Sequence, residues 1–304
     1  MSLVLTAGET MALLDPVADG EPRYGAALTL RVAGAESNFA IALARLGVGV
    51  TWVSRVGDDP FGRMLVEAVA GEGVDVRVRV DAVAPTGLFA KWRGADGPAN
   101  VYYRRGSAAS ALAPEDVPDE LLDGVALVHL TGITTALGAS ARELVHDLVR
   151  RAKARGALVS FDPNYRAALW ESPAEALAAH AELLPLVDWY LCGAAEGQLL
   201  FGVESAEQVL AAVLAAGAQE AVVRLGAEGA LTADGVVPPA RVVAVRDEIG
   251  AGDGFAAGYA WARLQDWDTQ RAVAAAHCVA ASVLHATGDW ETYPTRDELL
   301  AALS

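Results

Sequence analysis

The chain has 304 residues, of which 53% are hydrophobic, and its formal net charge is −16 at neutral pH. This length allows one large α/β domain or two domains, and the acidic balance argues against nucleic acid or an anionic membrane surface as a partner. Cys192 and Cys278 both lie in apolar runs, which indicates buried thiols rather than a disulfide framework. No basic segment precedes the first apolar stretch, so we expect no signal peptide and a cytoplasmic protein.

Short apolar runs alternate with helical patterns along most of the chain. Strands are predicted at residues 3–7, 51–56, 126–131, 157–161, 189–192 and 221–225. Helices are predicted at 38–46, 62–70, 141–154, 173–184, 206–214 and 255–264, with a further core helix within 272–287. Repeated strand–helix alternation predicts an α/β fold, a Rossmann-like three-layer sandwich with a mostly parallel central sheet. Ligands of such sheets bind at the carboxyl ends of the strands.

Two segments interrupt the alternation, at about residues 12–32 and 76–105. The second is typical of a hairpin, with strands at 87–93 and 100–105 around a turn at 94–98. We expect the strands of both segments to lie outside the central parallel sheet. We interpret the two segments as an insertion into one domain that spans residues 1–304.

The sequence DEIGAGDGFAAG at 247–258 carries the strongest chemical signal. Gly250, Ala251 and Gly252 allow a tight turn before a predicted helix, whose free N–H groups and dipole favour a bound anion, phosphate above all. Asp253 lies inside this anion hole, where a carboxylate would repel phosphate unless it had a role. Spacing alone leaves two roles open, a helix N-cap and the base that accepts the proton of a hydroxyl attacking phosphorus. At a helix N-terminus we expect Asp253 to be ionised.

Three polar residues, Asp162, Asn164 and Arg166, stand at alternating positions after the predicted strand 157–161. They indicate either a ligand site at the strand's carboxyl end or a turn closed by an Asx hydrogen bond at Asp162. The crowding of an acid, an amide and a guanidinium favours the ligand site.

The run VYYRR at 101–105 places Tyr103 and Arg105 on one side of a strand and Tyr102 and Arg104 on the other. One face could therefore offer an aromatic wall and a guanidinium to a ligand. The alternative is an edge strand whose charged side chains face solvent.

A glycine turn follows the predicted strand at 221–225 and contains Gly226 and Gly229. Most such turns only reverse the chain, and Arg224 could either reach a phosphate or extend along the strand end. No GxxxxGK[ST] sequence occurs, which excludes a P-loop kinase.

Two long motifs, one near each end of the chain, resemble the signatures of the ribokinase-like, phosphofructokinase-B-type carbohydrate kinases. DEIGAGDGF is similar to the family pattern Asp-Thr-x-Gly-Ala-Gly-Asp-x-Phe, with Glu248 in place of Thr, and AGAESNFA, ARLG and VGDDPFG at 33–40, 44–47 and 56–62 match the N-terminal signature. The resemblance covers essentially the whole chain. It implies that the segments at about 12–32 and 76–105 form a small β lid over a sugar site, often shared in a homodimer or higher homo-oligomer, with ATP and Mg²⁺ bound. It also implies that Asp253 is catalytic, together with the turn at Gly250, Ala251 and Gly252. We expect the N–H groups of Ala251, Gly252 and Asp253 to form the anion hole.

The same resemblance implies a nucleotide site. The family's Asn-x-x-Glu corresponds to residues 193–196, where Glu196 matches as an indirect Mg²⁺ contact and Gly193 replaces the Asn. Asp247 is the residue that the resemblance implies as a possible contact of a monovalent cation such as K⁺. The residues assigned to cofactor binding are Asp162, Asn164, Glu196, Arg224, Gly226 and Gly229.

The segments 102–108 and 162–170 are similar to those of 2-keto-3-deoxygluconate kinases. That similarity implies that Arg105 and Arg166 hold a sugar-acid carboxylate, and that the sugar is lined by Gly34, Asn38, Phe89 and Tyr103. We therefore expect ATP-dependent phosphorylation of 2-keto-3-deoxygluconate at its 6-hydroxyl. Fructokinases share the Asp-Pro-Asn-x-Arg segment and are the alternative within the class. Outside it, the alternative is a non-catalytic sugar-binding regulatory protein.

Overall fold

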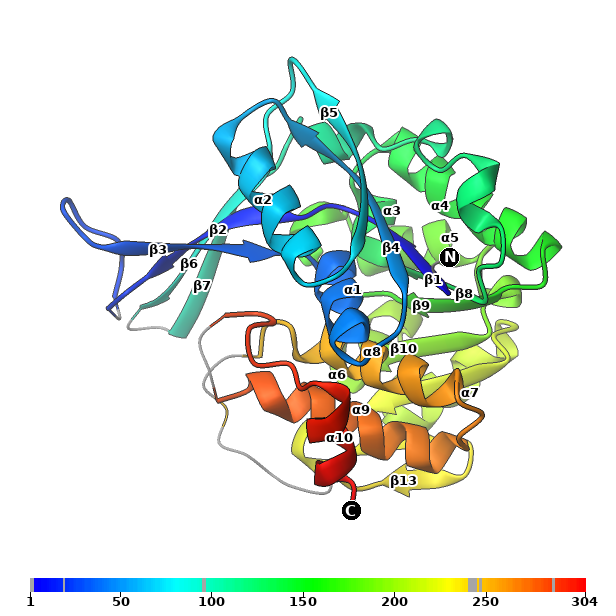
Figure 1. Cartoon of the computed structure of the whole chain (residues 1–304). Helices are drawn as coiled ribbons and strands as arrows, with labels where there is room; N and C mark the ends of the chain where they lie inside the picture. The colour runs from blue at the N-terminus through cyan, green and yellow to red at the C-terminus, as the bar shows by residue number, and fades with distance from the viewer. Residues whose placement is uncertain (1–2, 19, 95–96, 240–244, 246–247, 286–287) are drawn as a thin grey trace.

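The computed structural model describes residues 3–304, except 19, 95–96, 240–244, 246–247 and 286–287. Figure 1 shows a large sheet covered by helices, with a smaller sheet that projects from one end. Within the described residues the large sheet has nine strands, in the order β13-β12-β11-β10-β9-β8-β1-β4-β5. Their bounds are β1 Val4–Ala7, β4 Val50–Gly57, β5 Asp75–Asp81, β8 Leu127–Thr131, β9 Leu158–Asp162, β10 Trp189–Gly193, β11 Glu220–Arg224, β12 Ala230–Thr232 and β13 Gly235–Val237.

Neighbouring strands run parallel from β11 to β5, and β12 and β13 add an antiparallel edge beside β11. The predicted parallel sheet is therefore confirmed, and each of its predicted strands is present. The antiparallel edge was not predicted, because its two strands have only three residues each.

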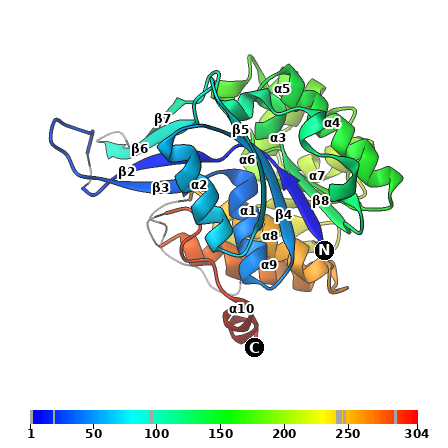
Figure 2. The ribbon, with the colours of Figure 1, turned by 45° about the horizontal axis from the view of Figure 1, so that its top comes forward.

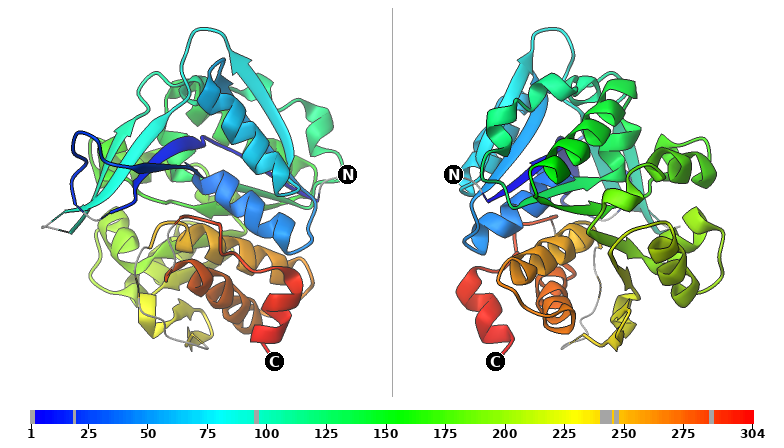
Figure 3. Two further views of the ribbon diagram at one scale, coloured as in Figure 1. Left: turned by 60° about the vertical axis from the view of Figure 1, so that its left-hand side comes forward. Right: turned by 90° about the vertical axis from the view of Figure 1, so that its right-hand side faces the viewer.

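Helices cover both faces of the large sheet (Figure 3). Their bounds are α1 Ala35–Arg45, α2 Pro60–Gly71, α3 Gly132–Ala136, α4 Ala139–Ala154, α5 Pro173–His180, α6 Ala194–Phe201, α7 Ala206–Ala215, α8 Ala251–Arg263, α9 Thr269–Val283 and α10 Arg296–Ala302. Side chains of α1, α2, α8 and α9 share one buried core, and those of α4 and α7 share the other. Consecutive strand residues such as Val222 and Val223 point into opposite cores, as the two-residue period of a strand requires. The three-layer prediction is confirmed.

The second predicted lid segment, at about 76–105, was placed too far toward the N-terminus. Residues Asp75–Asp81 form β5, which pairs in parallel with β4 from Thr51↔Asp75 to Gly57↔Asp81. This strand lies at the edge of the large sheet, where Val76 and Val78 pack on the core while Arg77 and Arg79 point away from it. An edge strand with one solvent-exposed face has the same alternating pattern of apolar and polar residues as a lid strand. The pattern therefore did not show to which sheet the segment belongs.

The small sheet has the strand order β3-β2-β6-β7 and projects away from the central layers (Figures 1 and 2). Its strands are β2 Met11–Pro16, β3 Leu28–Ala33, β6 Leu88–Gly94 and β7 Gly97–Tyr103. The hairpin of β6 and β7 is confirmed, although β7 ends at Tyr103 rather than 105. Met11, Leu13, Ala33 and Phe89 form its own small core, on the face toward the rest of the molecule.

No single helix among the described residues has the length and apolar composition needed to cross a bilayer. Helices α6 and α7 meet that test only as a pair bent by 57°.

Candidate active site

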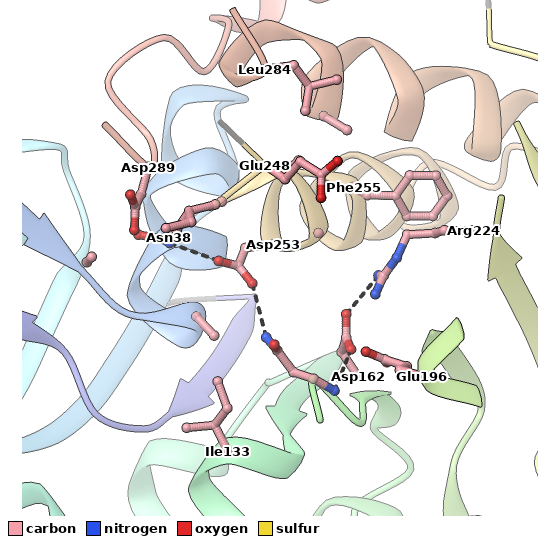
Figure 4. Close-up of a pocket in the computed structure, with 18 of the residues that line it drawn as sticks. Asn38, Ile133, Asp162, Glu196, Arg224, Glu248, Asp253, Phe255, Leu284 and Asp289 are labelled. Carbon is pink, nitrogen blue, oxygen red and sulfur yellow. Dashed lines mark hydrogen bonds and ion pairs between the residues drawn. The ribbon is translucent and has the colours of Figure 1, made fainter. Parts of the chain in front are cut away.

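A cavity of about 570 Å³ lies where the carboxyl ends of β9 and β11 meet the small sheet and the first turn of α8 (Figure 4). Such a position is expected for ligands of parallel α/β sheets. Most residues singled out from the sequence line it: Gly34, Asn38, Phe89, Asp162, Asn164, Arg166, Glu196, Arg224, Gly226, Gly229, Gly250, Ala251, Gly252 and Asp253. Tyr103 and Arg105 are not among the lining residues. Asp247 lies outside the described residues.

Asp253 is the third residue of α8, and its carboxylate is held from two sides (Figure 4). Asn38 Nδ2 of α1 donates to Oδ2 at 2.8 Å, and Asn164 Nδ2 donates to Oδ1 at 3.4 Å. The N-cap of α8 is Gly250, and no side chain caps this helix. The alternative that Asp253 is an N-cap is therefore wrong, and its side chain points into the cavity instead.

The turn before α8 depends on glycine at position 250. Gly250 has φ 83°, and a Cβ there would collide with the backbone oxygen of Asp289. Its carbonyl accepts a 2.5 Å hydrogen bond from the Tyr293 hydroxyl. These contacts fix the direction in which the first amides of α8 point.

The predicted three-amide anion hole is smaller than expected. The N–H of Ala251 donates to the carbonyl of Glu248 at 3.2 Å, which closes the turn and occupies that donor. The amides of Gly252 and Asp253 lie in the first turn of α8, where N–H groups have no intrahelical acceptor. Arg224 lies next to them, since a Cβ on Gly252 would be 3.7 Å from its guanidinium. The structure thus adds a cation to a two-amide site.

The helix N-terminus was expected to favour the ionised form of Asp253, but its surroundings shift the pKa in the opposite direction. Burial raises its pKa to about 8, and the neighbouring carboxylates of Asp162 and Asp289 also raise it. The hydrogen bond from Asn38 lowers the pKa but does not offset these effects. The dipole of the helix start favours the ionised form, but the carboxyl group is enclosed by protein and lies near other acids. Burial and these acids outweigh the dipole, so the pKa is raised.

Asp162 and Arg224 form an ion pair at the carboxyl ends of β9 and β11. Arg224 Nη1 donates to Asp162 Oδ2 at 2.8 Å, and the backbone N–H of Asn164 donates to Oδ1 at 2.8 Å. The Asx turn is therefore present at this segment, and Asp162, Asn164 and Arg166 also line the cavity. Glu196 in the first turn of α6 lies nearby, where burial and Asp162 raise its pKa to about 7 while Arg224 lowers it.

The side of the cavity next to the small sheet is lined by Tyr102 and Arg104, so the wrong face of β7 was assigned to the cavity from the sequence. Phe89 pairs with Tyr102 across the hairpin, and their rings stack with centroids 5.3 Å apart. Tyr103 is 67% exposed, and Arg105 is also exposed. The hairpin register explains the error, because the inward-pointing Phe89 selects Tyr102 and Arg104 for the same face. The predicted turn at 94–98 does not give this register, since Gly94 already pairs with Gly97.

The cavity also includes residues that the sequence motifs did not indicate, most of them apolar. Helix α9 contributes Ala280 and Ala281 as well as His277, and Leu284 follows the helix. Met11 of β2 and Ile133 of α3 were missed in the same way. Residues of this kind give no local signal, since an apolar helix face looks the same whether it meets a core or a cavity.

Comparisons with known proteins agree with this geometry. The model of the pfkB family of carbohydrate kinases matches residues 1–296. The chain is 36% identical to a 2-dehydro-3-deoxygluconokinase of Bacillus subtilis over 99% of its length and 95% of the relative's. It is 38% identical to a 2-dehydro-3-deoxygluconokinase of Thermoproteus tenax, over 100% of its length and 95% of the relative's.

Two solved structures are similar over almost the whole chain. The PfkB protein of Polaromonas sp. JS666 is 38% identical, with a TM-score of 0.87 over 99% of this chain and 100% of that one. A putative ribokinase II of E. coli in complex with ATP and Mg²⁺ is 26% identical, with a TM-score of 0.88 over 100% of this chain and 99% of that one.

Proposed function

Because the chain belongs to the pfkB family of carbohydrate kinases, we propose that it transfers the γ-phosphoryl group of ATP to the 6-hydroxyl of 2-keto-3-deoxygluconate, also called 2-dehydro-3-deoxygluconate. The observation that carries the choice of acceptor is the pair of arginines in the cavity, Arg104 and Arg166. A neutral sugar offers only hydroxyl groups to these two guanidinium groups, whereas a sugar acid offers the carboxylate that arginine binds best. In a chain of net charge −16, such local positive charge is needed to hold an anion.

The proposed reaction is an in-line phosphoryl transfer with Asp253 as the base. The acceptor oxygen bonds to the γ-phosphorus, its proton passes to the Asp253 carboxylate, and the bond to the β–γ bridging oxygen breaks to release ADP. A base with a pKa of about 8 is well matched to this role near neutral pH. The amides of Gly252 and Asp253, together with Arg224, stabilise negative charge on the transferred group.

Asn38 links the acceptor to the base. Its Nδ2 donates to Asp253, whereas its Oδ1 is buried and accepts no hydrogen bond from the described part of the chain. A buried amide oxygen without a donor is costly, so this atom fits a substrate hydroxyl. One amide would then orient the acceptor and the base together.

The residues present also fit Mg²⁺. No group of three or more His, Cys, Asp or Glu side chains within the described residues could hold a metal ion by itself. Mg²⁺ does not require such a cage, because it binds through one or two carboxylates, water and substrate phosphates. Glu196, whose buried Oε1 has no hydrogen-bond partner among the described residues, would contribute a carboxylate beside Asp162. When bound, the ion neutralises phosphate charge.

Purified enzyme with MgATP and a panel of acceptors tests the proposed function through ADP release. We expect kcat/KM for 2-keto-3-deoxygluconate to exceed that for fructose by at least about tenfold, since a charged hydrogen bond contributes about 1.5–3 kcal/mol. A preference for fructose would identify a fructokinase instead. Sugar binding without ADP release from any acceptor would indicate a non-catalytic binding protein.

Replacing Gly193 with asparagine should lower the KM for MgATP. Gly193 is the N-cap of α6, and the space around its Cβ position is open, so the longer side chain fits. The new carboxamide would stand three residues before Glu196, which lines the cavity. Steady-state kinetics with varied MgATP measure the effect, with Gly193→Ala as the control for the backbone. An unchanged or higher KM in Gly193→Asn would contradict the prediction.

We further propose that the chain forms a dimer through the outer face of the small sheet. Leu28 and Leu30 of β3 and Val101 and Tyr103 of β7 are 38–67% exposed there, an unusual apolar face for a free surface. We expect sedimentation of a dimer at micromolar concentration, and of a monomer for the double variant Leu30→Asp, Tyr103→Asp. Val83→Asp is the matched control, since Val83 is 94% exposed but lies outside the small sheet. A monomeric wild type would refute the interface.

A further inference from the structure

We infer that Glu9 is a positioning residue that orients Arg104 toward the acceptor and so determines the preference for an acidic sugar. This inference rests on the proposed function, because it concerns how the cavity recognises a carboxylate. Glu9 does not line the cavity and stands in none of the sequence motifs discussed above. Its contacts with the segment that follows β7 assign it the role.

Glu9 is buried between β1 and β2 and is 2% exposed. One carboxylate oxygen accepts a 2.5 Å hydrogen bond from the Ser107 hydroxyl, and the other forms an ion pair with Arg104 Nη2. Gly87 of the adjacent segment leaves room for this carboxylate, since a Cβ there would lie 2.7 Å from Glu9 Oε1. The carboxylate is therefore enclosed, and its position is fixed by packing.

The two partners of Glu9 are the ends of one turn. The N–H of Ser107 donates to the carbonyl of Arg104 at 3.0 Å, and Gly106 within the turn has φ 72°. By holding both ends, Glu9 fixes the turn that follows β7. This arrangement keeps Arg104 inward while Arg105, the next residue, stays exposed.

The ion pair occupies only part of the Arg104 guanidinium. This side chain is 9% exposed and lines the cavity, its guanidinium carbon lies 5.9 Å from the centre of the Tyr102 ring, and Nε donates no hydrogen bond within the described residues. Donors thus remain for a ligand. A buried ion pair is weak evidence for stability, but it restricts a long side chain to one orientation, which lowers the entropy lost when a ligand binds.

Removing the Glu9 charge has two opposite effects on a bound carboxylate. It would strengthen the positive potential at the cavity, and it would release Arg104 from its orientation. Arg166, which is exposed, already supplies a positive charge that is not paired with Glu9. Arg104 adds directed hydrogen bonds to the ligand. We therefore expect the loss of its orientation to outweigh the gain in positive potential, so that the sugar acid binds more weakly.

The test is the variant Glu9→Gln, which keeps the shape and removes the charge. We expect KM for 2-keto-3-deoxygluconate to rise about tenfold, while kcat and the KM for fructose change little. The effect should vanish in a double-mutant cycle, because in an Arg104→Lys background there is no guanidinium fork left to orient. Glu9→Asp, which keeps the charge but shortens its reach, should act in the same direction and replaces Glu9→Gln if that variant does not fold.

The matched control is Asp116→Asn. Asp116 is also a buried acid paired with an arginine, at 2.7 Å from Arg55, but it does not line the cavity. The variant Asp116→Asn should lower the melting temperature without changing the ratio of the KM for 2-keto-3-deoxygluconate to the KM for fructose. Equal effects of Glu9→Gln on both substrates, an unchanged or lower KM for the sugar acid, or a full effect in the Arg104→Lys background would overturn the inference. The proposed function fails separately, if wild-type enzyme does not prefer the sugar acid.

Discussion

Asp253→Asn should lower kcat roughly 10²–10⁴-fold, which is the range for a positioned general base. Asparagine cannot accept the proton of the attacking hydroxyl, but it keeps the size of the side chain. Its single amide oxygen can still accept from Asn38, the shorter of the two hydrogen bonds that hold Asp253 at 2.8 and 3.4 Å. The KM values for MgATP and for the sugar should therefore change little. Single-turnover kinetics and ligand titration separate the two effects. A kcat near that of the wild type would remove Asp253 from the role of base.

The same substitution should stabilise the protein, and more so at high pH. Burial raises the pKa of Asp253 from 3.8 to about 8, so folding favours the protonated form. Its contribution to stability is therefore full below about pH 4, and is lost as the pH rises through about 8. The asparagine side chain does not titrate, so the variant should melt above the wild type at pH 8.5 and close to it at pH 4. Each kcal/mol corresponds to roughly 2–4 °C.

The control for both measurements is Asp58→Asn. The Asp58 side chain is 67% exposed and lies outside the cavity, so neither turnover nor the pH dependence of melting should change. The wild-type kcat/KM should rise with pH and level off near 8, because the free enzyme must lose the Asp253 proton before it can act as a base. A profile that levels off below pH 5 would mean that the pKa of Asp253 in solution is not raised.

Arg104→Lys should raise KM for 2-keto-3-deoxygluconate by about tenfold or more, since a charged hydrogen bond contributes about 1.5–3 kcal/mol. Lysine keeps a cation beside the buried Glu9 carboxylate, so the variant should fold, but it loses the planar fork that matches a carboxylate. Arg166→Leu should raise the same KM to a similar extent. Residual phosphorylation of fructose should be affected much less, because fructose has no carboxylate to lose.

The neighbour Arg105 provides the decisive comparison. It was the residue expected from the sequence, but its side chain is exposed and does not line the cavity. Arg105→Leu should therefore leave the KM for the sugar acid within about twofold, inside the usual range of a surface substitution. A large rise in KM for Arg105→Leu and none for Arg104→Lys would restore the original assignment. Equal losses for both acceptors would mean that Arg104 and Arg166 are structural.

The sequence by itself determined the central parallel sheet, the helices that cover it and the position of Asp253 after a glycine turn. These features depend on local physics, namely the two-residue and 3.6-residue periods of apolar residues and the backbone freedom of glycine. The strand β5 was not predicted, because its alternating residues fell inside the segment assigned to the lid, and one solvent-exposed face looks the same in either sheet.

Only the tertiary structure decided which face of β7 meets the cavity and which charge Asp253 carries. Tyr102 and Arg104 line the cavity because β7 pairs with β6 in a register that follows Phe89, and Glu9, remote in sequence, then holds Arg104. The pKa of Asp253 is raised by burial and by Asp162 and Asp289, which no motif places beside it. Orientation and ionisation depend on what distant segments bring within a few ångströms, and a local pattern contains no record of those neighbours.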